Sequence, residues 1–395
     1  MRTLRLKRNE DHRLRAGHLW VFSNEVDVAH TPLTAFEAGE PVQIQDSRGT
    51  TVGSGYVNPR SLICARLVSR QPDRPLDGDL LRTRLRSALA LRARLFGEEP
   101  FYRLAYGESD GMPGLIVDRF GDVLVAQITT AGVERLRDEV VAALAELLQP
   151  SGILLRNDTG SRELEGLESY VEVAHGTVPD RAEIRENGVR FVVPLTGGQK
   201  TGWFYDHRDN RARLPRYVVG RRVLDVFSYA GGWGIQAAVG GASEVVCLDS
   251  SATALRLLGE SAELNGVADR MSTLQDDAFD ALRDLGHAGE RFDLIVLDPP
   301  AFIKRRKDQK QGEKAYQKIN RLAVELLPRD GILVSASCSF HMGRDALLDA
   351  ILRAGRDTKR ELQILEEGHQ APDHPVHPAI PETSYLKAFF ARVMD

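Results

Sequence analysis

The second half of the chain alternates short apolar runs with segments of helical periodicity. Five apolar runs of strand length follow one another, at 222–227, 244–248, 271–274, 292–297 and 331–336. This βαβα order predicts a mostly parallel sheet that is covered by helices on both faces. Ligands of such sheets bind at the carboxyl ends of the strands, so the residues after each run are the first candidates for chemistry.

The first half of the chain has shorter runs, typical of small β-rich modules. Residues 42–45 alternate apolar and polar side chains, 46–49 form a turn sequence, and 62–68 are a second apolar run. These features predict a small β structure at the N-terminus. Residues 71–78 are rich in proline and aspartate and predict a linker, and the leucines of 79–96 have the spacing of a helix.

A second β-rich module is predicted after this helix. Residues 114–128 have the pattern of a hairpin around a Gly-Asp turn, 133–148 have helical spacing, and 152–156 are a further apolar run. An Asn-Gly pair then stands at the centre of 184–193, which is the strongest short signal for a β-hairpin. We expect this hairpin to lead into the parallel sheet.

Composition limits the classes of protein that fit this pattern. The 395 residues are 42% hydrophobic and 27% charged, which is ordinary for a globular chain of two or three domains. No apolar run is long enough to span a membrane, and the charged N-terminus lacks the core of a signal peptide, so no membrane partner is expected. A net charge of -4 means that any nucleic-acid contact must come from local basic patches.

The cysteines and histidines predict neither a disulfide framework nor a metal site. Cys64, Cys247 and Cys338 are far apart and lack the CxxC spacing, which fits the reducing cytoplasm. His374 and His377 lie in a proline-rich stretch without the further ligands that a metal would need. We therefore expect a cytoplasmic protein without bound metal.

A glycine-bearing loop follows the first strand of the predicted parallel sheet. The strand contains Asp225, the loop begins at Phe227, and a helix covers about 234–239. Strand, glycine turn and helix let a nucleotide-like ligand approach the backbone, and an acid about 20 positions further on can bind its ribose. Asp249, at the end of the second strand, supplies that acid. Since the loop is not GxGxxG, it favours S-adenosylmethionine over a pyrophosphate ligand; an ordinary βα turn is the alternative.

Three further strand ends carry groups that suit chemistry. Asp277 could accept the amino group of an adenine beside Ala278, or it could simply cap a helix. Asp298 begins an Asp-Pro-Pro sequence, and the prolines would fix this acid at the sheet edge for hydrogen bonding or proton transfer, unless the turn is purely structural. Cys338 follows the fifth strand among serines, where we predict a nucleophilic thiolate rather than a small buried apolar group.

Residues 197–211 and two basic stretches predict further contacts. The segment 197–211 is dense in aromatic and hydrogen-bonding groups and would form a wall over the cofactor, or else a polar helix cap. The basic N-terminus stands beside aromatic residues, which suits RNA, although solvated arginines around a core Trp20 would give the same pattern. The second basic stretch follows the Pro-Pro loop and predicts phosphate binding. The RNA-binding residues predicted are Arg5, Lys7, Arg8, Lys304, Arg305, Arg306 and Lys307.

With these motifs in hand, the sequence resembles the RlmI-type class I S-adenosylmethionine-dependent methyltransferases, which make 5-methylcytosine in large-subunit (23S) ribosomal RNA. The resemblance covers essentially the whole chain. It is carried by GGQKTGWFYDHRDNR at 197–211, LDVFSYAGGWG at 224–234, LDPPAF at 297–302 and SCSF at 337–340. The family usually has glutamine where this chain has His207.

The resemblance implies an α/β fold with three domains. Residues 1–72 would form a PUA-like RNA-binding β-barrel, 73–190 a central α+β domain, and 191–395 a Rossmann-like methyltransferase domain. It implies ribosomal RNA or a large-subunit precursor as partner, and a homodimer. The cofactor-binding residues implied are Lys200, Thr201, Asp206, Arg208, Asp225, Phe227, Ser228, Tyr229, Gly231, Gly232, Asp249, Ser250, Asp277, Ala278 and Asp298.

The resemblance also implies that Cys338 is the catalytic nucleophile and that Asp298 assists it. Carbon 5 of cytosine is a weak nucleophile, and addition of a thiolate at carbon 6 makes it reactive towards the methyl group. Free cysteine has a pKa of roughly 8.5, so the surroundings of Cys338 must activate it. Two alternatives remain open: methylation of a base nitrogen, which needs no cysteine, and an RNA-binding assembly factor without activity.

Overall fold

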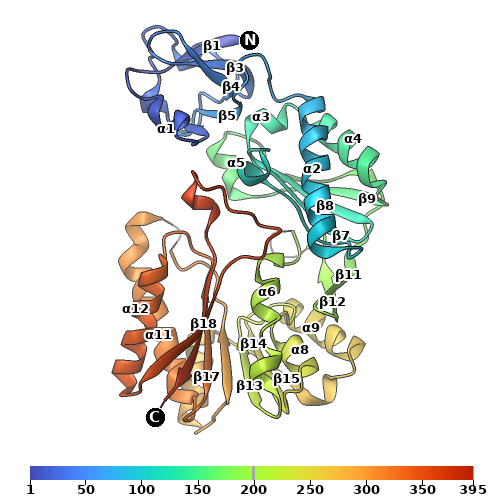
Figure 1. Ribbon diagram of the computed structural model, residues 1–395. Coiled ribbons are helices and arrows are strands. Elements are labelled where there is room, and N and C mark those ends of the chain that lie inside the picture. Colours follow the sequence, from blue (N-terminus) through green and yellow to red (C-terminus); the bar gives the residue numbers. More distant parts are fainter. Residues whose placement is uncertain (198–200, 304, 395) are drawn as a thin grey trace. The chain divides into compact units, whose positions relative to one another are not determined.

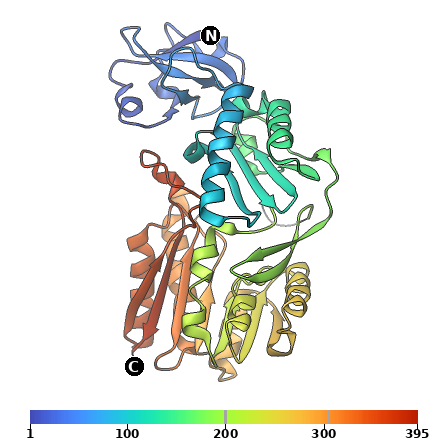
Figure 2. The ribbon, with the colours of Figure 1, turned by 45° about the vertical axis from the view of Figure 1, so that its right-hand side comes forward.

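The chain passes several times between two structural units (Figures 1 and 2). The computed structural model describes residues 1–197, 201–303 and 305–394. Among these residues, no helix is both long and apolar enough to cross a membrane. The first unit comprises Met1–Ala182, Pro194–Trp203 and Pro372–Thr383, and the second comprises Glu183–Val193, Phe204–Ala371 and Ser384–Asp395.

The N-terminal part of the first unit is a five-stranded sheet with the order β1-β3-β4-β5-β2. The alternation predicted at 42–45 is confirmed: Val42 and Ile44 are buried, whereas Gln43 and Gln45 are half-buried. This pattern arises because successive side chains of a strand point to opposite faces. β1 pairs parallel with β3, and the other neighbours are antiparallel. The elements are β1 (Arg2–Arg5), α1 (His12–Arg15), β2 (Trp20–Val21), β3 (Glu40–Gln45), β4 (Thr51–Val57) and β5 (Ala65–Ser69).

The rest of the first unit is a second five-stranded sheet, with the order β10-β9-β8-β7-β6. The hairpin predicted over 114–128 and the helix predicted over 79–96 are confirmed. The helix predicted over 133–148 is interrupted at Leu136, whose backbone leaves the helical region with φ -108° and ψ 20°. The elements are α2 (Gly78–Phe96), β6 (Phe101–Tyr106), β7 (Leu115–Phe120), β8 (Val123–Ile128), α3 (Ala131–Glu134), α4 (Arg137–Leu148), β9 (Gly152–Asn157), α5 (Gly160–Leu164) and β10 (Tyr170–Gly176).

A buried network of polar groups holds the proline-rich stretch that contains His374. The side chain of Arg92, which is fully buried on α2, pairs with Asp110 at 2.7 Å and donates to the carbonyl of Asp373 at 2.7 Å. The Asp373 carboxylate accepts from the backbone N–H of Arg103 at 3.0 Å, and its other oxygen lies 2.8 Å from Nδ1 of His374. This network fixes the stretch to the core of the first unit.

The second unit is built on a seven-stranded sheet with the order β15-β14-β13-β16-β17-β19-β18. The five predicted strands are confirmed as its parallel part, with ends that agree to within two residues. β19 pairs antiparallel with both β17 and β18. The sequence pattern predicts β17 but neither β18 nor β19, because the stretch between β18 and β19 interrupts the alternation of strands and helices. The strands are β13 (Arg222–Val226), β14 (Glu244–Asp249), β15 (Met271–Gln275), β16 (Leu294–Leu297), β17 (Ile332–Ser337), β18 (Leu362–Gly368) and β19 (Lys387–Val393).

Helices cover both faces of this sheet, as predicted (Figure 1). Leu224 and Val226 share one apolar core with α10, α11 and α12. Asp225, which points to the opposite face, lies against α8 and accepts a hydrogen bond from Gly234. The helices are α6 (Arg208–Arg211), α7 (Pro215–Val218), α8 (Gly234–Val239), α9 (Ala252–Leu264), α10 (Ala278–His287), α11 (Gln309–Leu326) and α12 (Arg344–Thr358).

The Asn-Gly hairpin is also confirmed. β11 (Arg181–Glu186) and β12 (Val189–Pro194) form a two-stranded sheet. Asn187 and Gly188 connect them with φ angles of 54° and 80°, the left-handed backbone that this turn requires. The three predicted domain boundaries stay a prediction, although each of the three large sheets lies within one of the predicted ranges.

Candidate functional site

The parallel register brings the predicted strand ends together at one edge of the sheet. Val226 is level with Leu248 on β14 and with Leu297 on β16, and Leu297 is level with Ser335 on β17. The loop after β13, Asp249, Asp298 and Cys338 therefore all emerge at the same edge. This edge is where open α/β sheets bind their ligands.

The loop after β13 is held in a conformation that is rare for residues with side chains. Phe227 and Tyr229 have φ angles of 65° and 47°, and such backbones cost about 1–3 kcal/mol each. The Tyr229 N–H donates to Oδ2 of Asp249 at 2.9 Å, and the Ser228 N–H donates to the Leu248 carbonyl at 3.0 Å. Oδ1 of Asp249 accepts from the N–H of Ser251 at 2.8 Å. Asp249 thus fixes the loop that the sequence predicted to surround a ligand.

Asp225 lies beneath this loop and is completely buried. Its Oδ2 accepts from the Gly234 N–H at 2.8 Å, at the start of α8. The pKa of Asp225 is raised to about 7, mainly by burial and to a smaller extent by the nearby carboxylates of Asp298 and Asp249. The carboxyl group therefore holds the backbone that follows the loop, and we expect it to act on a ligand through that backbone.

Asp298 is half-buried and is held from two sides. The Trp233 indole N–H donates to Oδ2 at 3.0 Å, and Nε2 of His207 lies 3.2 Å from Oδ1. The His207 contact is electrostatic rather than a well-aligned hydrogen bond. Burial raises the pKa of Asp298, but His207 and the Trp233 hydrogen bond lower it more, so the pKa lies below its ordinary value. The carboxylate is therefore ionised and fixed in direction.

The tautomer of His207 follows from its other neighbour. Nδ2 of Asn210 donates to the His369 carbonyl at 3.1 Å and lies 3.1 Å from Nδ1 of His207. Because an amide nitrogen can only donate, Nδ1 of His207 accepts and the proton of the imidazole is on Nε2. This N–H side of the ring faces Asp298. Sequence reasoning gave no role to His207 or Trp233 individually, because their partners come from other elements.

Cys338 differs from the other two cysteines in its surroundings. Cys64 and Cys247 are buried, and burial raises the pKa of Cys64 to about 12 and that of Cys247 well above the usual value. Cys338 is half-buried, and its Sγ lies 4.0 Å from the carbonyl of Pro299. The Ser339 hydroxyl donates to the Ile303 carbonyl at 2.7 Å. These contacts tie the loop that carries Cys338 to the loop that begins at Asp298.

Lys387, on the unpredicted strand β19, also lies at this edge. It is paired in register with Ser337, the residue before Cys338. Its Nζ donates to the carbonyls of Ser339 and Tyr385 at 2.6 and 2.7 Å. The sequence contains one hint of this position, which is a lysine at the start of an apolar run near the C-terminus.

The end of β15 fits both roles that the sequence left open for Asp277. Oδ1 of Asp277 accepts from the N–H groups of Phe279 and Asp280 at 2.9 and 3.3 Å, so Asp277 is the N-cap of α10. The residue is nevertheless exposed, and the buried Ala278 follows it. The rings of Phe279 and Phe302 lie 5.9 Å apart beside this cap.

The predicted cofactor wall is divided between the two units. Thr201 belongs to the first unit, where its hydroxyl donates to Asp118 at 2.5 Å. Asp206 and Arg208 belong to the second unit and are buried there; Oδ2 of Asp206 accepts from the Tyr385 hydroxyl at 2.5 Å. Lys200 lies outside the described residues.

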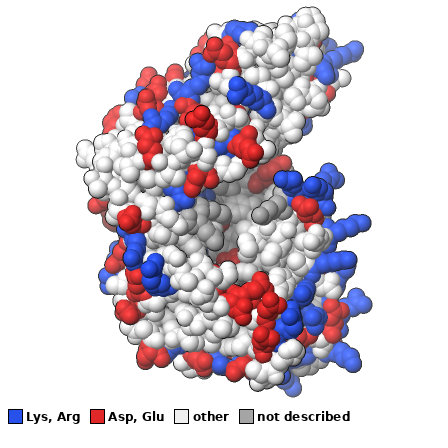
Figure 3. All heavy atoms as spheres, turned by 180° about the vertical axis from the view of Figure 1, so that it is seen from behind, with Lys and Arg blue, Asp and Glu red and all other residues white. Residues whose placement is uncertain are grey.

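The predicted RNA-binding residues differ in exposure. Arg5 is half-buried and donates to the Ser47 carbonyl, and Lys7 is exposed and donates to the Asn24 carbonyl at 2.7 Å. Arg8 is exposed, and so is the basic stretch Arg305, Arg306 and Lys307 before α11. Lys304 lies outside the described residues. Figure 3 shows lysine and arginine side chains gathered along the edge of the second unit where α11 and α12 lie.

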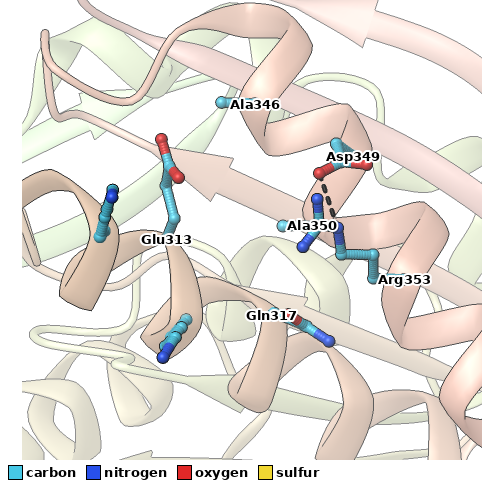
Figure 4. A pocket seen from close by; sticks show the side chains of 8 residues that line it. Glu313, Gln317, Ala346, Asp349, Ala350 and Arg353 are labelled. Atoms are coloured by element: carbon cyan, nitrogen blue, oxygen red, sulfur yellow. Dashed lines mark ion pairs between the residues drawn. The ribbon is translucent and has the colours of Figure 1, made fainter.

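A surface groove lies between α11 and α12 (Figure 4). Its walls carry charges of both signs, and Arg353 pairs with Asp349 one turn away on α12 at 2.8 Å. None of the residues predicted to bind a ligand lines it. The lining residues are Lys310, Glu313, Lys314, Gln317, Ala346, Asp349, Ala350 and Arg353.

Comparison with known proteins agrees with this geometry. Residues 166–392 match the family described as S-adenosylmethionine-dependent methyltransferase, and residues 4–70 match the PUA-like domain. Ribosomal RNA large subunit methyltransferase I of Shewanella denitrificans is 37% identical over 394 residues, and the protein of the same name from Tolumonas auensis is 39% identical over 398. Each match covers 99% of both chains.

A solved structure shows the same fold. SMU.776, described as a methyltransferase complexed with SAH, has a TM-score of 0.85 at 22% identity and covers all of both chains. The identity and coverage of the relatives, together with the matching domains, settle the family. The chain belongs to the ribosomal RNA large subunit methyltransferase I family and combines a PUA-like domain with an S-adenosylmethionine-dependent methyltransferase domain.

Proposed function

We propose that the protein transfers a methyl group from S-adenosylmethionine to carbon 5 of a cytosine in large-subunit ribosomal RNA, through a covalent adduct with Cys338. The observation that carries this proposal is the position of the thiol. Cys338 is half-buried at the carboxyl edge of the sheet, and its Sγ lies 4.0 Å from the carbonyl of Pro299, the residue after Asp298. The names of the relatives supply the substrate class.

The residues at the ends of β13, β14 and β15 fit S-adenosylmethionine. Oγ of Ser228 is buried and has no hydrogen-bond partner among the described residues, so a polar group of a ligand at this loop would satisfy it. Asp249 is half-buried, and its carboxylate oxygens keep lone pairs for the ribose hydroxyls. Oδ1 of Asp277 caps α10, so the adenine amino group would meet Oδ2. When bound, the cofactor supplies an electrophilic methyl group.

The chain's own groups then make the cytosine reactive. The Cys338 thiolate would add to carbon 6, so that electron density moves to carbon 5. Carbon 5 would then take the methyl group, while the donor sulfur keeps the electron pair of the broken bond and leaves as S-adenosylhomocysteine. The Asp298 carboxylate would accept a hydrogen bond from the cytosine amino group next to N3 and steady the ring during the addition. A base removes the proton from carbon 5, the bond between carbon 6 and sulfur breaks, and Cys338 leaves as a thiolate. The cytosine must be unstacked to reach the thiol, which favours a flipped or flexible nucleotide.

The test is methyl transfer from labelled cofactor to ribosomal RNA by a Cys338→Ala variant. We expect the rate to fall by about a thousandfold or more, as for other nucleophile deletions, while a Cys64→Ala variant keeps its activity. Nucleoside analysis of the product should give 5-methylcytosine. Full activity of Cys338→Ala with a methylated base nitrogen would favour the alternative chemistry. Absence of cofactor binding in calorimetry would favour an assembly factor without activity.

A further inference from the structure

Lys387 is an ammonium group in a half-buried position next to the proposed nucleophile. Two of its three N–H donors are used by the carbonyls of Ser339 and Tyr385, at 2.6 and 2.7 Å. One of these carbonyls belongs to the residue after Cys338, and the register of β17 and β19 places Lys387 level with the residue before it. The strand pairing and the two hydrogen bonds therefore hold the ammonium at the loop that carries the thiol.

Among the titratable groups described around this ammonium, the thiol of Cys338 is the one whose negative charge would act on it. Burial lowers the pKa of Lys387 to about 8, and Cys338 acts in the opposite direction. Tyr316 of α11 contacts the neighbouring Ser337 through its hydroxyl at 2.8 Å; burial raises its pKa, so it stays neutral. Asp298 is another charged group at this edge, and it is held by Trp233 and His207. A buried lysine is costly unless an anion compensates it, and a thiolate can be that anion.

We propose that Lys387 is a positioning residue whose ammonium stabilises the thiolate of Cys338 and so makes the sulfur reactive at neutral pH. This inference rests on the proposed function, in which Cys338 is the nucleophile. The hydrogen bonds to two carbonyls hold the charge in place but do not neutralise it. The carbonyl of Ser339 links the two groups, so that movement of the loop after β17 would move both.

The test is the pH dependence of alkylation of Cys338 by iodoacetamide in the full chain, followed by mass spectrometry of its peptide. In the unaltered protein we expect the midpoint to lie below the value of roughly 8.5 for a free cysteine. Lys387→Gln keeps hydrogen-bond donors for the two carbonyls and removes the charge, so the midpoint should rise by about one unit or more. Lys387→Arg keeps the charge and should restore the lower midpoint. The buried Cys64 and Cys247 are internal controls for unfolding.

Two results would overturn the inference. One is an alkylation midpoint of Cys338 in the unaltered protein that lies at or above that of free cysteine. This measurement does not depend on any variant. The other is an unchanged midpoint in a folded Lys387→Gln variant. A different result would contradict the proposed function. If Cys338→Ala keeps its methyl-transfer activity, that function is wrong, whatever the midpoint of alkylation. An inactive Cys338→Ala variant combined with an unchanged midpoint in Lys387→Gln would leave the function and remove the role of Lys387.

Discussion

Nε2 of His207 lies 3.2 Å from Oδ1 of Asp298. The hydrogen-bond network places the imidazole proton on the side that faces this carboxylate. Trp233 holds the other carboxylate oxygen at 3.0 Å. The acid beside the proposed nucleophile is therefore oriented by two side chains from the segments before and after β13.

This arrangement predicts a pH effect for His207→Gln. His207 lowers the pKa of Asp298, so its removal raises that pKa and the carboxylate protonates earlier as the pH falls. The acidic limb of the rate of methyl transfer should move to higher pH by about half a unit to one unit. Because the pKa of Asp298 lies below its ordinary value of 3.8, the shift would be measured as single-turnover rates from about pH 3 to about pH 6. An acidic limb that stays in place would show that Asp298 does not need to be ionised or that His207 does not influence it.

Asp225→Asn should stabilise the protein at neutral pH. The folded-state pKa of Asp225 is about 7 and its ordinary value is 3.8, so between these pH values the folded state binds one proton more than the unfolded state. Stability contributed by this group is therefore present at low pH and is lost as the pH rises through about 7. The variant should gain roughly 2–4 kcal/mol above pH 7 and almost nothing near pH 4. Asparagine can still accept from the Gly234 N–H.

Urea denaturation at several pH values would measure the effect of Asp225→Asn. The control is Asp269→Asn, an exposed carboxylate whose replacement should leave the pH dependence unchanged. A variant that loses stability equally at every pH would mean that the ionised form of Asp225 is needed to hold the loop.

Gly234→Ala should destabilise the start of α8. A Cβ at this position would lie 2.5 Å from Sγ of Cys247 and 3.0 Å from Oδ2 of Asp225, and both groups are buried. Overpacking of this kind costs about 1–3 kcal/mol. Gly259→Ala on α9 is the matched control, because nothing lies within 4 Å of its Cβ and alanine is a better helix former. It should raise the melting temperature, and a neutral Gly234→Ala would contradict the close packing.

Arg92→Ala should strongly destabilise the first unit. Arg92 is fully buried and pairs with Asp110, and its loss would leave a buried carboxylate without its cation. Breaking such a pair costs about 3–5 kcal/mol. Arg86→Ala on the same helix removes only an exposed pair with Glu146 and should change stability by less than about 1 kcal/mol. Equal effects of the two variants in thermal unfolding would contradict a special role for the buried network.

Replacement of Arg305, Arg306 and Lys307 by alanine should weaken RNA binding. The three side chains are exposed and follow the loop of Asp298, so they are placed to contact phosphates near the site. Each lost contact should reduce the slope of log affinity against log salt by about 0.7–0.9. Filter binding across a salt series would measure the slope. The same replacement of Lys310, Lys314 and Lys318 on α11 is the control and should have the smaller effect.

The sequence by itself predicted the five parallel strands and the side chains that follow them. Alternation and apolar runs predicted the five parallel strands, and the order of strands and helices predicted a sheet covered on both faces. Because parallel strands end at one edge, the sequence was enough to place Asp249, Asp298 and Cys338 at the same edge of the sheet. The Asn-Gly turn at 187–188 and the hairpin around 121–122 were equally readable, since both depend on local backbone preferences.

Only the tertiary structure decided which groups act on these residues. His207 and Lys387 reach the site from segments far away in sequence, and no local period records that they meet Asp298 and Cys338. β19 escaped prediction because an antiparallel strand added after a long connection breaks the alternation that identified the others. The charge and the pKa of Asp298 and Cys338 depend on these distant neighbours and on burial. A sequence pattern contains neither kind of information.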